Sequence, residues 1–296
     1  MLWVNIRQLG LSLLFLCLLL GCSREPVAPG NPVAAVEGLA EAIRDNDLVR
    51  YSKLSLPPKL HARMMQRWTE EQALAPALTE AQRKDHARYM KQMMEPGAEA
   101  RLFKRYESKL SKFQSELNSQ WPMMQGGARI FVTGAIKANE DLTPAERDHA
   151  MAISQAVLKW LNPKVFDDKE KAREAITVIC RMAREVNLPQ AEQMRQLSMT
   201  ATLEKGGIAL KGLKDIGLIY GVDANESLDK MEAKLIDADV SGNDATVEVN
   251  YVLLDQNIRF EIDMTRIDDR WYPADSVQEA QQTLKQALPA AAASAP

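Results

Sequence analysis

The residue of this 296-residue chain whose position most clearly suggests chemistry is Cys22. Its thiol directly follows a stretch from Leu9 to Leu20 that is apolar apart from Gly10 and Ser12. A bilayer-spanning helix needs roughly 20 apolar residues, whereas the core of a secretory signal needs about 7 to 15. We therefore expect residues 1–21 to be a signal peptide, and we expect Cys22 to serve as an attachment point outside the fold.

The four residues Leu19, Leu20, Gly21 and Cys22 resemble the lipobox of bacterial lipoproteins. The resemblance implies that Cys22 receives a diacylglyceryl thioether, becomes the first mature residue, and is then N-acylated with a fatty acid such as palmitate. Ser23 is similar to the pattern that sorts lipoproteins to the outer membrane. Because several acyl chains on one cysteine give a stable tether, the resemblance implies a lipid-anchored protein of the cell outer membrane that faces the periplasm.

Two other stretches approach binding motifs. Asp237 to Glu248 has the oxygen-ligand spacing of a calcium loop, although Asp244 stands where that loop has an apolar residue. The calcium loop and a hairpin with solvated acids both stay open, and we favour the hairpin. Gly207, Gly212 and Lys214 approach a phosphate-binding loop, but no Ser or Thr follows the lysine. We expect these glycines to let helices approach closely or to break them.

No motif predicts catalysis, a metal or a cofactor. The three histidines, His61, His86 and His149, are too far apart in sequence for a zinc-hydrolase motif. No nucleophile elbow or kinase signature occurs, and carboxylates are too abundant to single out a glycosidase pair. Cys180 is the one thiol expected in the mature domain, and its place on an apolar stripe predicts a small buried side chain.

The elements that position these residues divide into two kinds. From residue 33 to about 203, apolar residues recur every three or four positions, and Thr79 with Gln82 and Thr143 with Glu146 form two capping boxes. After Leu235 the apolar period becomes two, which predicts antiparallel strands. The fold class is therefore α+β and predominantly helical, a helical bundle followed by a small antiparallel β-meander. The apolar helical positions include Leu60, Met64, Trp68, Leu102, Tyr106, Met194, Leu197 and Ala201.

The two ends resemble cystatin-like or nuclear-transport-factor-two-like domains of envelope lipoproteins. The resemblance is carried by VAAVEGLAEAIRDNDLVRYSKL, which begins at Val33, and by strands separated by SGNDA, DQN and DDRWY. It covers about 65 residues and implies a large helical insertion between the two ends.

Charge is distributed unevenly along the chain. Arg83 to Lys112 holds nine bases and four acids, whereas Asp223 to Asp269 holds thirteen acids and four bases. These segments are either solvated faces, or surfaces that recruit a partner of opposite charge. With a formal net charge of −3, nothing in the composition suggests nucleic-acid binding.

We expect five segments: a signal peptide at 1–21, a lipidated tether at 22–32, a helical region at 33–222, an acidic α+β region with the meander at 223–288, and a disordered tail at 289–296. The expected function is a non-catalytic binding or scaffold module, held on the membrane through Cys22, with a protein or envelope polymer as partner. An immunity-type lipoprotein that neutralises a periplasmic toxin, and an enzyme that acts on the cell wall, are the alternatives.

Overall fold

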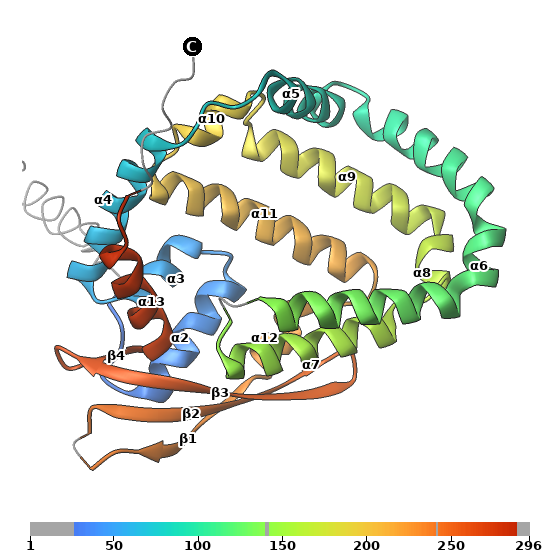
Figure 1. The fold of residues 1–296 in the computed structure, drawn as a ribbon. Coiled ribbons are helices and arrows are strands. Elements are labelled where there is room, and N and C mark those ends of the chain that lie inside the picture. Colours follow the sequence, from blue (N-terminus) through green and yellow to red (C-terminus); the bar gives the residue numbers. More distant parts are fainter. Residues whose placement is uncertain (1–26, 140–141, 241, 289–296) are drawn as a thin grey trace, which may run out of the picture.

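The computed structural model describes residues 27–139, 142–240 and 242–288. These residues form eleven helices, then four strands, and then a twelfth helix (Figure 1). This confirms the α+β, predominantly helical class with an antiparallel β-meander near the C-terminal end. The elements are α2 (Pro32–Arg44), α3 (Leu48–Ser55), α4 (Pro58–Leu74), α5 (Glu80–Met94), α6 (Ala98–Ala138), α7 (Pro144–Trp160), α8 (Lys164–Asp167), α9 (Lys169–Val186), α10 (Ala191–Arg195), α11 (Met199–Ile219), α12 (Ala224–Asp229), β1 (Glu232–Ala238), β2 (Asp244–Leu253), β3 (Gln256–Ile267), β4 (Arg270–Pro273) and α13 (Ala274–Lys285).

Local sequence signals place the helix starts. Both predicted capping boxes are present, at Thr79 before α5 and at Thr143 before α7. The expected stripe from Met194 to Ala201 is wrong as one helix, because Ser198 caps the first turn of α11 and separates it from α10. A serine hydroxyl that accepts a backbone N–H satisfies a donor that the first helical turn leaves open, so it starts a helix and does not continue one. Among the helices of the described residues, none combines the length and apolarity needed to cross a bilayer.

The four strands pair in sequence order, β1-β2-β3-β4, and every pair is antiparallel. The predicted alternation is confirmed: Val247 lies opposite Ile262 and Val249 lies opposite Phe260, on the face that is turned toward the helices. β1 forms one edge, and its pairing with β2 shifts between Leu235 and Asp237, as in a β-bulge.

The first helix belongs to the core of the sheet. Ala35 and Val36 of α2 are buried against Val247, Val249 and Met264, so the core joins the two ends of the chain. A second apolar cluster brings α4 and α13 together with β4, and its buried residues are Ala28, Leu56, Leu60, Tyr272, Val277 and Ala280.

The expected tether is shorter than 22–32. Ala28 is only 1% exposed, and the N–H of Trp271 donates to the carbonyl of Pro29 over 3.1 Å. Prolines lack the N–H donor, but their carbonyls still accept, so this segment can satisfy a donor of β4. Residues 28–32 are therefore part of the domain. Cys22, the signal peptide and the 289–296 tail lie outside the described residues.

The remaining helices form an open ring around α9 and α11 (Figure 1). α5 and α6 pack against α9, and α9 packs against α11. α6 is 41 residues long and contains Pro122. A proline inside a helix removes one backbone hydrogen bond and bends the helix, and Figure 1 shows α6 changing direction along its length.

The glycines of α11 lie in close contact with other parts of the chain, whereas those of α6 do not. A Cβ on Gly207 would clash with the backbone carbonyl of Asn46, and a Cβ on Gly212 would lie 2.7 Å from Sδ of Met182. These glycines let α11 approach the α2–α3 turn and α9, as the sequence predicts. In contrast, a Cβ on Gly126, Gly127 or Gly134 of α6 would meet nothing within 4 Å.

We predict that Gly207→Ala lowers the free energy of unfolding by about 1–3 kcal/mol, because the added methyl group must displace backbone. Gly127→Ala is the matched control and should raise it by about 0.5–1 kcal/mol, since only helix propensity changes there. Urea denaturation followed by circular dichroism measures both values. Equal effects of the two substitutions would contradict the close contact at Gly207.

Candidate ligand-binding pocket

A pocket of about 550 Å³ lies between the inner face of the sheet and helices α2, α7, α11 and α12. α2 packs on β1, β2 and β4, whereas α7 packs on β3, and residues of both helices line the pocket beside Tyr251 and Phe260. Most of the wall is apolar, and its principal side chains are Val36, Leu39, Ile43, Leu210, Val249 and Ile262.

His149 of α7 is the central polar group of this wall. Its ring stacks on Phe260 with 3.8 Å between ring centroids and an angle of 10° between the planes. Its Nε2 atom lies 2.8 Å from the hydroxyl of Tyr251, whose ring meets the imidazole edge-on. The stack and the hydrogen bond together fix the ring against β2 and β3.

Burial keeps both members of this pair neutral. It raises the pKa of Tyr251 to about 12, and it lowers the pKa of His149 below its ordinary value. At neutral pH the phenol therefore keeps its proton and the imidazole is neutral, and one hydrogen bond joins the hydroxyl to Nε2. The pair is a neutral hydrogen bond in an apolar wall and not an ion pair.

Four carboxylates line the same pocket, those of Glu146, Glu261, Asp263 and Asp275. Arg259 lies 4.0 Å from Glu261, and the hydroxyl of Thr246 donates to Asp263, which leaves Asp275 and Glu146. Burial, and secondarily the charge of Glu146, raise the pKa of the Asp275 carboxyl. Glu146 accepts from the backbone N–H and the hydroxyl of Thr143, which it caps. Among the described residues, neither carboxylate has a Lys, Arg or His within ion-pair distance. The pocket therefore presents negative charge beside an apolar wall.

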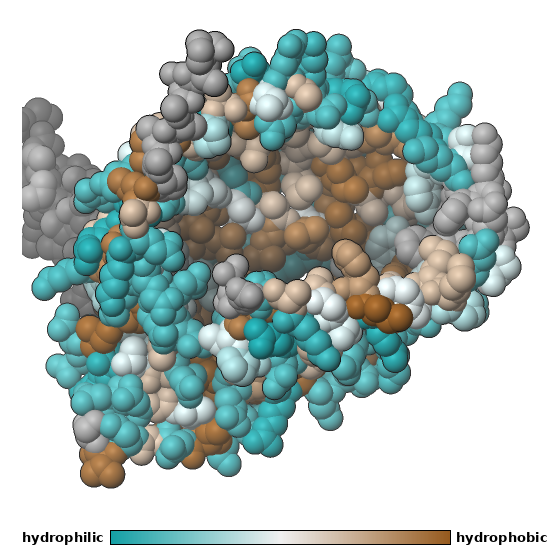
Figure 2. Space-filling view, viewed as in Figure 1, coloured by the Kyte–Doolittle hydropathy of each residue, from teal (hydrophilic) through white to brown (hydrophobic). Residues whose placement is uncertain are grey.

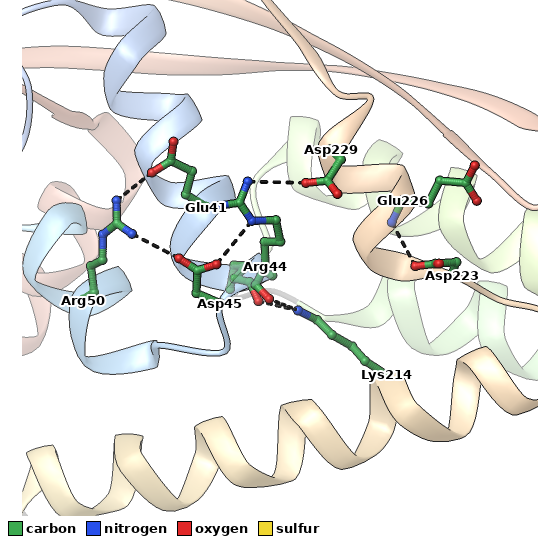
Figure 3. A network of polar contacts seen from close by, with 9 residues as sticks. Glu41, Arg44, Asp45, Arg50, Lys214, Asp223, Glu226 and Asp229 are labelled. Atoms are coloured by element: carbon green, nitrogen blue, oxygen red, sulfur yellow. Dashed lines mark hydrogen bonds and ion pairs between the residues drawn. The ribbon is translucent and has the colours of Figure 1, made fainter.

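Lys214 also lines the pocket, but its ammonium group is engaged. Nζ donates to the carbonyls of Ile43 and Arg44 at the C-terminal end of α2 (Figure 3). Burial lowers the pKa of this lysine. Cations are favoured at a helix C-terminus, so Lys214 joins α11 to α2 and does not neutralise the carboxylates.

A polar network holds the same corner from outside (Figure 3). Arg50 of α3 binds Glu41 over 2.7 Å and Asp45 over 3.4 Å, and Arg44 reaches both Asp45 and Asp229 of α12. These contacts link α2, α3 and α12. They fix three helices that each contribute residues to the pocket lining.

The structure separates the residues that the sequence singled out. His61 contacts Ser52 and His86 donates to the carbonyl of Leu188, so only His149 reaches the pocket. Cys180 is fully buried, as predicted, and burial raises the pKa of its thiol. Lys214 belongs to the stretch that approaches a phosphate-binding loop in sequence, but its ammonium group donates to backbone carbonyls.

The segment from Asp237 to Glu248 forms the β1–β2 hairpin. The carboxylate of Asp239 accepts the backbone N–H groups of Asn243 and Asp244, and Glu248 pairs with Arg259 of β3. The carboxylates are thus used within the turn and across strands. In the described part of the chain, no three His, Cys, Asp or Glu side chains are grouped so that they could hold a metal ion.

Sequence reasoning missed the pocket. The alternation places Tyr251 and Phe260 on the inner face, but nothing in the sequence indicates that α2 leaves them uncovered. His149 and Asp275 come from elements more than a hundred residues apart, and no local spacing connects them. Comparisons with protein-family models, curated proteins and solved structures found no match, so the ligand of this pocket is inferred from its own side chains.

We predict that acidification from pH 7.5 to 6.0 destabilises the fold in part through His149. The pKa of His149 is lower in the folded chain than in the unfolded chain, so the unfolded chain binds a proton more readily. The free energy of unfolding is therefore highest above the ordinary pKa of histidine and decreases as the pH falls through that value. His149→Gln retains a hydrogen-bonding side chain but does not titrate. Thermal melts should show a smaller pH dependence for this variant, and an unchanged dependence would contradict the burial of the imidazole.

Proposed function

We propose that this chain is a lipid-anchored envelope lipoprotein, held on the periplasmic face of the outer membrane through Cys22, that acts as a non-catalytic binding module. Its pocket takes an apolar small molecule that carries a positive charge. The observation that supports this type of ligand most directly is the apolar cavity, whose lining includes the carboxylates Asp275 and Glu146 without a paired cation in the described part of the chain.

The size and composition of the pocket suit an apolar ligand. Sites for small molecules typically measure about 300–1,000 Å³ and have mainly apolar walls with a few polar groups. A volume of about 550 Å³ falls in this range. Burying a methylene group contributes about 0.8 kcal/mol, so a medium-length alkyl chain would supply most of the affinity.

The charge of the ligand follows from the carboxylates. A cationic group beside Asp275 would favour its ionised form and would offset the repulsion from Glu146. An anionic head group would meet like charge and would have no free cation, since Lys214 is bound to α2.

The anchor would keep this pocket close to a membrane. Ala28 is buried in the domain, and five residues lie between it and Cys22. An extended chain spans at most about 3.6 Å per residue, so the domain would stay within about 20 Å of the lipidated cysteine. Amphiphilic molecules partition to that interface, where the pocket can meet them.

We predict that decyltrimethylammonium, below its micelle concentration, binds the protein without residues 1–22 and that decyl sulfate binds at least tenfold more weakly. Asp275→Asn should weaken binding of decyltrimethylammonium about tenfold. It should therefore reduce the difference in affinity between decyltrimethylammonium and decyl sulfate. Glu232→Gln, which removes an exposed acid of β1 outside the pocket, is the matched control. Isothermal titration calorimetry measures all three, and equal affinity for the two ions would refute a cation-selective pocket.

The anchor is tested separately. Cells grown with radiolabelled palmitate should incorporate it into the wild-type protein and not into Cys22→Ala, because Cys22 is the cysteine of the lipobox-like stretch. The variant should accumulate as unprocessed precursor. Label in the Cys22→Ala protein, or an unmodified mature amino terminus in mass spectra, would overturn the anchoring while leaving the pocket proposal intact.

A further inference from the structure

The part of α6 beyond Pro122 exposes an apolar stripe to solvent. Met123 is 70% exposed, and Ile130 and Phe131 are each 76% exposed. Positions 123, 127, 130, 131 and 134 lie on one face because they are spaced by three, four and seven residues. Exposed apolar area that is contiguous on one helix is typical of an interaction surface.

The helix that carries this stripe borders a hollow in the molecule (Figures 1 and 2). Figure 2 shows a depression whose floor is apolar over α9 and α11 and whose lower rim, over α6, carries further apolar surface. On α11, Leu213 and Leu218 are exposed although that helix packs against α9. The hollow is bounded by α4, α5 and α6 (Figure 1), so it is concave and elongated rather than flat.

The packing of the described residues does not require glycine at three positions of α6. Gly126, Gly127 and Gly134 lie inside a helix, where glycine weakens helical structure, and an added Cβ on any of them would meet nothing within 4 Å. By contrast, Gly207 and Gly212 permit close contacts within the molecule. Small residues on an exposed helix leave room for the backbone of another helix to approach.

The charges on α6 indicate the sign of the occupant. Arg129 and Lys137 are exposed beside the stripe, and neither has a carboxylate within ion-pair distance among the described residues. The sequence contains no acid from Leu117 to Asn139. The apolar stripe is therefore flanked by positive charge without internal compensation.

We propose that this hollow, with the α6 stripe on its rim, binds an acidic amphipathic helix of a partner protein. The apolar face of that helix covers Met123, Ile130 and Phe131, its backbone approaches the α6 glycines, and its carboxylates face the flanking cations. A planar membrane does not fit a concave surface bounded by helices on several sides. A second copy docked through the same face would bring cationic helices together.

The test uses two synthetic 18-residue amphipathic helices labelled with fluorescein, identical in their leucine face and carrying either glutamate or lysine on the polar face. The protein without residues 1–22 should bind the glutamate peptide with micromolar affinity by fluorescence anisotropy. Binding should weaken at least fivefold between 50 and 500 mM NaCl. The lysine peptide should bind at least tenfold more weakly than the glutamate peptide.

Variants locate the site. Ile130→Ser with Phe131→Ser should weaken the glutamate peptide at least tenfold, whereas Val252→Ser, which changes an exposed apolar residue of β2, should have no effect. Gly127→Leu with Gly134→Leu should weaken binding to the same degree while the melting temperature stays equal or rises. Retention of affinity in the glycine variant would refute the close approach of a helix.

Three results overturn the proposal. The first is equal binding of both peptides, or no binding of either at 200 μM. The second is sedimentation of the protein with phosphatidylglycerol vesicles that is lost in the Ile130/Phe131 variant, which would assign the stripe to a membrane. The third is a dimer in analytical ultracentrifugation that the same variant dissociates, which would assign the stripe to a second copy.

Discussion

The packing of α2 on the inner face of the sheet is the contact on which the rest of the structure depends. Ala35 and Val36 close the core over Val247, Val249 and Met264, and this joins the N-terminal helix to strands that are two hundred residues later in sequence. The same helix receives Lys214 at its C-terminal carbonyls and Arg50 and Asp229 on its sides. The helical ring is thereby attached to the sheet through α2 and its neighbours. The pocket is the part of the inner face that α2 leaves uncovered.

That partial cover also explains the character of the pocket. A fully covered sheet would bury Tyr251 and Phe260 against aliphatic side chains, whereas here they meet an imidazole from α7. The hydroxyl of Tyr251 needs a partner in an apolar setting, and neutral His149 provides one. The Tyr251 hydroxyl and the imidazole of His149 thus satisfy each other, and Asp275 and Glu146 are two carboxylates of the lining without a cation among the described residues.

Much of the fold could be predicted from the sequence, because the signals concerned are local. The alternation from Ala245 to Met264 fixes which face of β2 and β3 is apolar, and Thr79 and Thr143 fix two helix starts. The segment from Ala28 to Pro32 could not be predicted, since its structure comes from the carbonyls that it offers to β4 and not from its own propensity. The pocket depends on how far α2 extends over the sheet, which is a tertiary property. Likewise, Gly207 and Gly127 look alike in sequence and differ only in what lies beside them.

The irregular pairing of β1 with β2 bears on the proposed attachment to a membrane. Anchoring concentrates molecules in two dimensions, so exposed sheet edges meet far more often than they would in dilute solution. β1 is an edge strand with exposed Leu235 and Ile236, which would favour edge-to-edge polymerisation. The register shift between Leu235 and Asp237 interrupts the straight row of hydrogen-bonding groups that a neighbouring molecule would need. In the proposed anchored state, this one-residue irregularity would hinder edge-to-edge aggregation.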